Sequence, residues 1–297
     1  MIGVWGVYAP YTRIGGFDLA RTNLNFHQTF KPERQYISGL LSEIECCNGL
    51  DIQEISNQTG IPTGKSSGKV EPTISYAEYM GLIKKQKCDG KYELEYTALG
   101  ECIRDEDSGL LEKLTLLLMH CMIVRPYGGA ELWAYIIHSV FPKYRNSLTI
   151  KQFEKEIELQ FGTSVKMAPF NGCYQDLFSS LNLVGISGDQ IQINAQKLDG
   201  DFVYLYAYVL FEYWKEWLEN ADSIEVTLAS ISEITSEHLK KIGFKNAFGW
   251  SEKEEYQVLE MMASKGLIVL NRQMIPFTVR RVVDTESLIE LLYSELC

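Results

Sequence analysis

Residues 60–100, GIPTGKSSGKVEPTISYAEYMGLIKKQKCDGKYELEYTALG, decide the fold. Pro72 favours the first turn of a helix, where its missing N–H costs no hydrogen bond, and Gly81 is a typical helix end. Alternating residues on both sides of the Gly-containing turn at 88–90 indicate two strands of a β-hairpin. The stretch therefore predicts a helix that is followed directly by a short hairpin.

Two more helices are predicted upstream, over 32–47 and 52–58, because apolar residues recur there at helical spacing. Three helices followed by a hairpin is the order of a winged helix-turn-helix. The pattern recurs twice downstream, where Thr149 and Ser251 each start a capping box before an amphipathic helix and a hairpin. We therefore expect a mainly α fold with small β-hairpin wings, built from repeated winged helix-turn-helix modules.

The segments between these modules are apolar. A helical pair is predicted over 110–123 and 131–141, and a long helix over 202–219. We interpret these segments as an apolar helical scaffold that joins the modules. The predicted domains are an N-terminal segment with the first module (1–100), a helical linker scaffold (101–146), a second module (147–200), and a long helix with a third module (201–297).

The charge of the chain is unevenly distributed. Of 297 residues, 28 are basic and 39 acidic, so the net charge is −11. Residues 1–99 carry 10 basic and 11 acidic side chains, and the remainder carries 18 and 28. A polyanion is therefore expected to meet the N-terminal third first.

The sequence shows neither an apolar run of the roughly 20 residues that a membrane span needs nor the pattern of a secretory signal. We therefore expect a cytoplasmic protein with no membrane contact. The seven cysteines lack any C-x-x-C spacing, which argues against a zinc site.

The first module carries a local excess of positive charge, with six lysines against three carboxylates between residues 61 and 91. Basic and hydroxyl side chains on one turn, helix and hairpin are suited to phosphate contacts. The predicted contacts to duplex DNA are Lys65, Ser66, Ser67, Lys69, Lys84, Lys85, Lys87 and Lys91. An ordinary solvated face of lysines is the alternative. The basic residues of 240–245 and 272–281 offer the third module as another phosphate-binding or dimer-forming face.

His27 lies in the segment Asn25-Phe26-His27-Gln28-Thr29-Phe30, just before Arg34. Two aromatic residues would anchor this segment and leave polar groups between them. Histidine is the most frequent general acid or base. The alternative is a buried histidine that holds the N-terminal segment against the first module. His120 and His138 lie within apolar helices and are expected to be core residues with satisfied hydrogen bonds.

Together with the first module, this segment resembles a bacterial family catalogued as domain of unknown function four thousand and seven. The likeness covers about residues 20–145 and depends on the order of its motifs rather than on one of them. The motifs are Phe26, His27, Thr29, Phe30 and Arg34; Gly64-Lys65; the helix that ends at Gly81-Leu82-Ile83; Thr97-Ala98-Leu99-Gly100; the acidic stretch 105–109; and the Leu-rich helix 110–120.

The resemblance implies work on duplex DNA in a phosphorothioation and phage-defence cluster, including nicking of one strand so that sulfur replaces a backbone oxygen. It implies partners of three kinds: cysteine desulfurase, ATPase and phosphoadenosine-phosphosulfate-reductase-like sulfur-transfer proteins. For nicking, His27 is the candidate general acid or base and Arg34 the candidate phosphate-stabilising group. Asp105, Glu106 and Asp107 are candidate ligands for Mg²⁺ or Mn²⁺. A helix N-terminus that favours negative charge is the alternative explanation for this acidic trio.

Three functions stay open on the sequence alone. The first is a DNA-binding protein that nicks one strand, as an endonuclease. The second is a non-catalytic adaptor that holds sulfur-transfer or ATPase partners on DNA. The third is a transcription regulator of a defence cluster, and homodimerisation is compatible with each of them.

Overall fold

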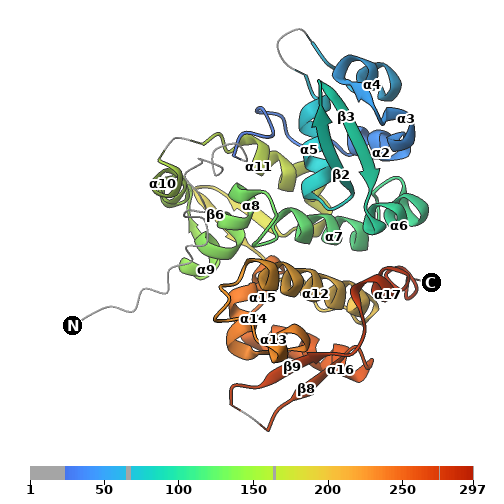
Figure 1. The fold of residues 1–297 in the computed structure, drawn as a ribbon. Helices are drawn as coiled ribbons and strands as arrows, with labels where there is room; N and C mark the ends of the chain where they lie inside the picture. The colour runs from blue at the N-terminus through green and yellow to red at the C-terminus, as the bar shows by residue number, and fades with distance from the viewer. Residues whose placement is uncertain (1–23, 65–67, 163–164, 274, 297) are drawn as a thin grey trace.

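The computed structural model describes residues 24–64, 68–162, 165–273 and 275–296. The fold is mainly helical, with three small antiparallel sheets. Helices α7 (Lys113–Ile123) and α12 (Val203–Asn220) contact each other between the first sheet and the third (Figure 1). No helix in the described ranges is long and apolar enough to cross a membrane.

The three sheets share one topology. Their strand orders are β1-β3-β2, β4-β6-β5 and β7-β9-β8, so in each the second strand of a hairpin lies between its partner and an earlier short strand. We call the parts of the chain that form them the first unit (34–96), the second unit (147–193) and the third unit (233–281). The prediction of a mainly α fold with small hairpins is confirmed.

The first unit agrees closely with the sequence analysis. Asp51 accepts hydrogen bonds from the backbone of Gln53 and Glu54 and so caps a helix, and the hairpin turns at Asp89 and Gly90, both with positive φ. The predicted helix over 32–47 is divided in two at Glu43. The elements are α2 (Arg34–Ser42), α3 (Ile44–Cys47), β1 (Leu50–Asp51), α4 (Ile52–Thr59), α5 (Val70–Tyr79), β2 (Ile83–Cys88) and β3 (Lys91–Tyr96).

In the other two units, the capping boxes predicted at Thr149 and Ser251 are both present. A third capping box in these units, at Thr235, begins the helix that carries His238. The second unit contains β4 (Ser147–Thr149), α10 (Ile150–Phe161), α11 (Ala168–Gly172), η2 (Cys173–Leu177), η3 (Ser179–Leu181), β5 (Val184–Ser187) and β6 (Gln190–Ile193). The third contains β7 (Glu233–Thr235), α14 (Ser236–Ile242), α15 (Phe244–Ala247), α16 (Glu252–Ser264), β8 (Ile268–Asn271) and β9 (Thr278–Arg281).

The apolar segments between the units form the buried centre, as predicted. All eleven residues of α7 except Lys113 are buried, and α12 buries most of its length, including Trp214 and Trp217. The remaining elements are α6 (Ala98–Asp107), α8 (Glu131–Tyr135), η1 (Ile136–Val140), α9 (Phe141–Lys143), η4 (Gly200–Phe202), α13 (Leu228–Ser232) and α17 (Thr285–Ile289).

His120 and His138 are core residues with backbone partners, as expected, but the Nδ1 of His138 is buried without a hydrogen-bond partner in the described residues. The Nε2 of His120 lies 2.8 Å from the carbonyl oxygen of Ala247, and its Nδ1 lies 3.1 Å from the Tyr174 hydroxyl. The Nε2 of His138 lies 2.7 Å from the carbonyl oxygen of Val124. His120 therefore connects α7 to the second and third units through one neutral imidazole.

Burial lowers the pKa of His120 from 6.5 to about 3. The unfolded chain therefore takes up a proton on His120 as the pH falls below about 6.5, whereas the folded chain does not, so the stability that depends on a neutral His120 is lost on acidification. His120→Gln keeps an N–H donor and a carbonyl acceptor but cannot titrate. We expect the free energy of unfolding of the wild type, minus that of this variant, to fall by about 1.4 kcal/mol per pH unit below about pH 6. Urea unfolding at several pH values measures this difference, and parallel stability curves would contradict it.

Candidate nucleic-acid interface and catalytic residues

Helix α5, the predicted DNA-facing helix of the first unit, is enclosed. Each of its residues is buried or half-buried, because α2, α4, β2 and α7 pack around it. A recognition helix needs an exposed face to enter the major groove. The half-buried residues of α5 are Glu71, Glu78 and Tyr79, so α5 offers little surface for base contacts, and that surface is acidic.

Three of the predicted DNA-binding lysines are engaged in ion pairs within the first unit and the segment just before it. Their ammonium groups lie 2.6 to 2.9 Å from carboxylate oxygens, in the pairs Lys69–Glu33, Lys85–Glu78 and Lys87–Glu71. Lys84 and Lys91 are exposed and form no ion pair with a described residue. Lys65, Ser66 and Ser67 lie outside the described residues.

The strand register explains how these charges are divided. Lys84 lies opposite Glu95 and Gln86 opposite Glu93, so the outward face of the hairpin carries acidic as well as basic groups. Lys85 and Lys87 alternate with Lys84 along β2 and point to the face that covers α5. The local positive charge seen in the sequence is therefore largely compensated, and DNA contact by these lysines stays a prediction.

His27 is buried, with 2% of its surface exposed. Its Nδ1 accepts a hydrogen bond of 3.0 Å from the backbone N–H of Thr29, and its ring packs against Phe26 and Trp133. Burial lowers the pKa of His27 to about 4, so the imidazole is neutral at pH 7. A general base needs a lone pair that the substrate can reach, and the only lone pair of this neutral ring is already used.

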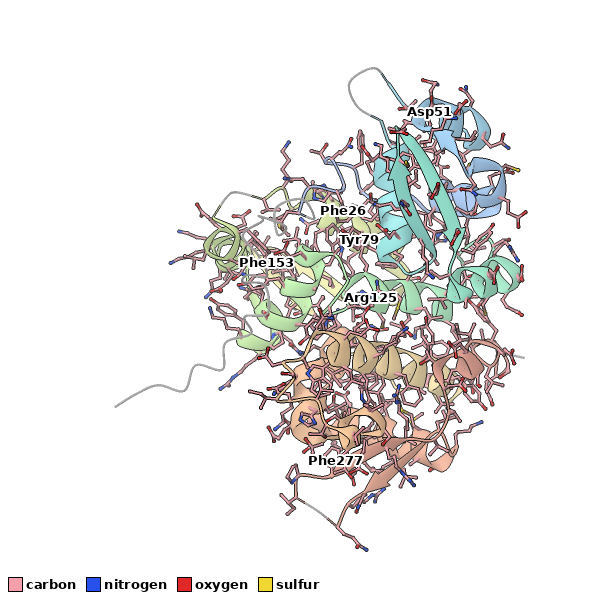
Figure 2. The ribbon with its side chains drawn as sticks, viewed as in Figure 1. Phe26, Asp51, Tyr79, Arg125, Phe153 and Phe277 are labelled. Atoms are coloured by element: carbon pink, nitrogen blue, oxygen red, sulfur yellow. The ribbon has the colours of Figure 1, made fainter. Side chains whose placement is uncertain are left out.

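The turn around His27 fixes the N-terminal segment against α5. The ring of Phe26 lies 4.7 Å from that of Tyr79 and 5.0 Å from that of Tyr76, and Figure 2 shows Phe26 beside Tyr79. The Tyr76 hydroxyl donates to the carbonyl oxygen of Phe30 at 2.9 Å. Thr29 has a φ of 85°, which is strained for a β-branched residue and needs packing to hold it. These contacts agree with the alternative interpretation, in which His27 anchors this segment.

Arg34 begins α2 and lines a groove of about 670 Å³ between the first and second units. Its guanidinium donates one hydrogen bond of 3.3 Å to the carbonyl oxygen of Leu177. In the same groove Lys31 forms an ion pair with Asp176. His27 does not line this groove, so the structure does not bring the two predicted catalytic residues together there.

Two solved structures match the described fold, whereas no family model and no curated protein matches the chain. One is described as "Magnesium ion-bound SspB crystal structure", with a TM-score of 0.65, and the other as "SspB crystal structure", with a TM-score of 0.64. The chain has the fold of SspB. Each match has 16% sequence identity and covers 91% of this chain and 87% of the SspB chain, so it shows the fold alone. The resemblance to the family of unknown function is not confirmed, because no family model matches.

The magnesium ion belongs to that SspB structure. The acidic trio of this chain is not arranged as a set of metal ligands. Asp105 pairs with the Nε of Arg104 at 2.8 Å. The two carboxylate oxygens of Asp107 accept hydrogen bonds from the backbone N–H groups of Leu111 and Glu112. In the described part of the chain no three His, Cys, Asp or Glu side chains are grouped to hold a metal ion. The residues present do not fit a cation at this trio, and Mg²⁺ or Mn²⁺ stays a prediction.

The trio also lies at the C-terminal turn of α6. The helix N-terminus that was the alternative explanation is therefore wrong. Asp107 instead organises the loop between α6 and α7 through its two backbone hydrogen bonds.

The basic residues of the third unit are mostly compensated. Arg272 pairs with Glu260 at 2.6 Å and Lys245 with Glu252 at 3.5 Å. Arg281 donates to the carbonyl oxygen of Ile231. This unit therefore presents a weaker phosphate-binding face than its sequence suggests.

One buried acid was missed by the sequence analysis. Glu131, the first residue of α8, is 8% exposed, and burial raises its pKa to about 7. It lies near Tyr79, whose pKa is raised to about 12 mainly by burial. No motif marks Glu131 in the sequence, because its burial results from packing between α8 and the first unit.

Proposed function

We propose that this chain is a DNA-binding component of a phosphorothioation system. This chain shares the fold of SspB over 91% of its length. The sequence resemblance described above implies a phosphorothioation system. We further propose that the sulfur-transfer, cysteine desulfurase and ATPase proteins of such a system are its partners.

We propose that the three units are winged helix-turn-helix modules, which the common strand order of their sheets supports. Because α5 offers little surface for base contacts, the first unit is proposed to contact the phosphate backbone rather than base edges. Such contacts give affinity with a strong salt dependence and little sequence preference. This disfavours the transcription regulator, which needs a marked preference for one sequence.

The observation that carries this proposal is the environment of Arg34. Its guanidinium has five N–H donors. One of them forms a long hydrogen bond to the carbonyl oxygen of Leu177 in an open groove. Arg34 is also the first residue of α2, where the unpaired N–H groups of a helix favour an anion. Lys31 lies in the same groove, and Lys84 and Lys91 are exposed cations on the hairpin of β2 and β3.

Charge reversal tests the proposal. We expect the triple variant Arg34→Glu, Lys84→Glu, Lys91→Glu to bind a random-sequence duplex at least about 30-fold more weakly at low salt, and to lower the salt slope by about 0.9 for each phosphate that the variant no longer neutralises. Fluorescence anisotropy with a labelled duplex measures both quantities. The matched control is Lys151→Glu, Lys155→Glu, Lys253→Glu, three exposed lysines on the other units. Equally weakened binding by the two triple variants would contradict the proposed interface.

A supercoiled plasmid added to the same preparations tests the finer claim of nicking. If the protein nicks DNA, the buried neutral His27 is proposed to position the N-terminal segment rather than to transfer a proton. His27→Gln should then retain nicking with an unchanged pH profile, whereas Arg34→Ala should lose it. Loss of nicking in a folded His27→Gln protein would contradict this and indicate that His27 acts as a general acid or base.

A further inference from the structure

A second groove, of about 1060 Å³, lies between the first and third units. One wall is the face of α12 that carries Glu212, Glu216 and Glu219, and the floor includes Leu99 of α6 and Met122 of α7. The third unit and the chain that follows it contribute the opposite wall. Of the residues predicted to contact DNA, Lys84 and Lys85 lie at its edge on β2, but no predicted function uses its glutamates.

The carboxylates of this groove have few partners. Glu216 pairs with Arg125 at 3.2 Å, and Figure 2 shows Arg125 near the centre of the molecule. The second carboxylate oxygen of Glu216 is buried without a hydrogen-bond partner in the described residues. Burial raises the pKa of Glu212, and the nearby carboxylates of Glu219 and Glu286 add to this effect, whereas the positive charges of Lys215 and Arg125 oppose it. Within the described ranges, Glu212, Glu219 and Glu286 form no ion pair.

The basic groups of the same groove neutralise these carboxylates only in part. Lys85 is paired with Glu78. Arg281 donates to a backbone carbonyl and lies over the ring of Trp214 at 4.8 Å. Lys215 and Lys84 are the remaining cations of the lining. The lining also contains the three unpaired glutamates and Asp284, whose carboxylate caps α17.

The groove also exposes large aliphatic side chains. Ile231 of α13 is 48% exposed and Val282, just after β9, is 54% exposed, and both line the groove. Aliphatic surface beside unpaired carboxylates repels a nucleic acid but suits a polypeptide that carries Lys or Arg among aliphatic residues. A cation from such a partner would pair with the exposed carboxylates of Glu219 and Glu286 and with the partly buried carboxylate of Glu212.

We propose that this groove is a docking site for a basic, aliphatic segment of a partner protein. Its ammonium or guanidinium groups pair with Glu212, Glu219 and Glu286, and its aliphatic side chains pack against Ile231 and Val282. The groove shares Lys84 with the proposed DNA interface, but Glu219, Glu286 and Val282 belong to the groove alone, so variants of these three residues test this proposal separately.

A peptide without DNA tests this proposal. The probe is a fluorescein-labelled amphipathic peptide of about 14 residues, in which short blocks of leucine and lysine alternate. As a helix it is roughly 21 Å long. A peptide of equal length with glutamate in place of lysine is its counterpart. We expect Glu219→Lys, Glu286→Lys, which changes two exposed residues, to weaken anisotropy-measured binding of the lysine peptide about tenfold or more. Val282→Ser should weaken it as well, and added salt should weaken binding to the wild type.

The matched control is Glu154→Lys, Glu158→Lys on the exposed face of α10 in the second unit. Equal binding by the groove variant and the control variant would overturn the proposal, as would equal binding of the two peptides to the wild type. Calorimetric titration with Mg²⁺ alone measures whether the groove binds a cation instead of a peptide. Saturable Mg²⁺ binding that Glu212→Gln abolishes, together with no peptide binding, would make the groove a cation site instead.

Discussion

Replacement of Gly100 by alanine is expected to lower the free energy of unfolding by more than about 3 kcal/mol. A Cβ atom on Gly100 would lie 1.8 Å from the carbonyl oxygen of Leu82 and 2.7 Å from its carbonyl carbon. These are backbone atoms, so no side-chain rotation relieves the clash. The start of α6 has to move away from Leu82, in the turn between α5 and β2, which breaks the contact between them.

The surrounding hydrogen bonds show why this close approach exists. The Thr97 hydroxyl accepts from the backbone N–H of Gly100 at 2.9 Å and donates to the carbonyl oxygen of Gly81 at 2.5 Å. The backbone N–H of Thr97 donates to Leu82 at 3.1 Å. The Thr97-Ala98-Leu99-Gly100 motif therefore fastens the first unit to the helical scaffold, and only glycine allows its last residue to come so close.

Gly39→Ala is the matched control. Gly39 also lies within a helix, α2, but its added Cβ would have only the carbonyl oxygen of Thr59 within 4 Å, at 3.9 Å. Alanine should therefore raise the free energy of unfolding by about 0.5 to 1 kcal/mol through its better helix propensity. Urea unfolding of both variants measures the contrast. A Gly100→Ala protein within about 1 kcal/mol of the wild type would show that α6 moves away from Leu82 at little cost.

Local signals predicted the helices and hairpins well because each depends on a few neighbouring residues. The capping boxes at Thr149 and Ser251 and the hairpin turn at Asp89-Gly90 are examples. The short strands β1, β4 and β7 were missed, because two or three residues are too few to show an alternating pattern. Their pairing is decided by the hairpin strand to which each is hydrogen-bonded.

The candidate site was less predictable, because its electrostatics depend on pairs that are distant in sequence. Glu33 neutralises Lys69 across 36 positions, and the alternation along β2 directs Lys85 and Lys87 toward glutamates of α5. Counting charges along the chain cannot show which of them meet. His27 was marked by its aromatic neighbours, but only the position of Trp133 explains why it is buried.

Trp133→Ala is the other change for which we expect a large effect, a loss of about 3 to 5 kcal/mol in the free energy of unfolding. The Trp133 side chain is fully buried. Its ring lies 5.6 Å from that of Phe26, 6.1 Å from Tyr76 and 5.7 Å from Phe170, which belong to the N-terminal segment, α5 and α11. Its removal leaves a cavity at the point where these three parts of the chain meet.

The same cavity should release the N-terminal segment before the protein unfolds globally. Thr29 holds a strained φ that packing of the adjacent Phe26 and His27 stabilises. Chymotrypsin should therefore cut at Phe26 or Phe30 faster in Trp133→Ala than in Trp133→Phe, which keeps most of the ring volume. Equal cleavage of the two variants would mean that the segment is held by its hydrogen bonds, such as that from Tyr76 to Phe30, and not by this aromatic packing. The anchoring role inferred for His27 would then lose its main support, which is the contact of its ring with Trp133.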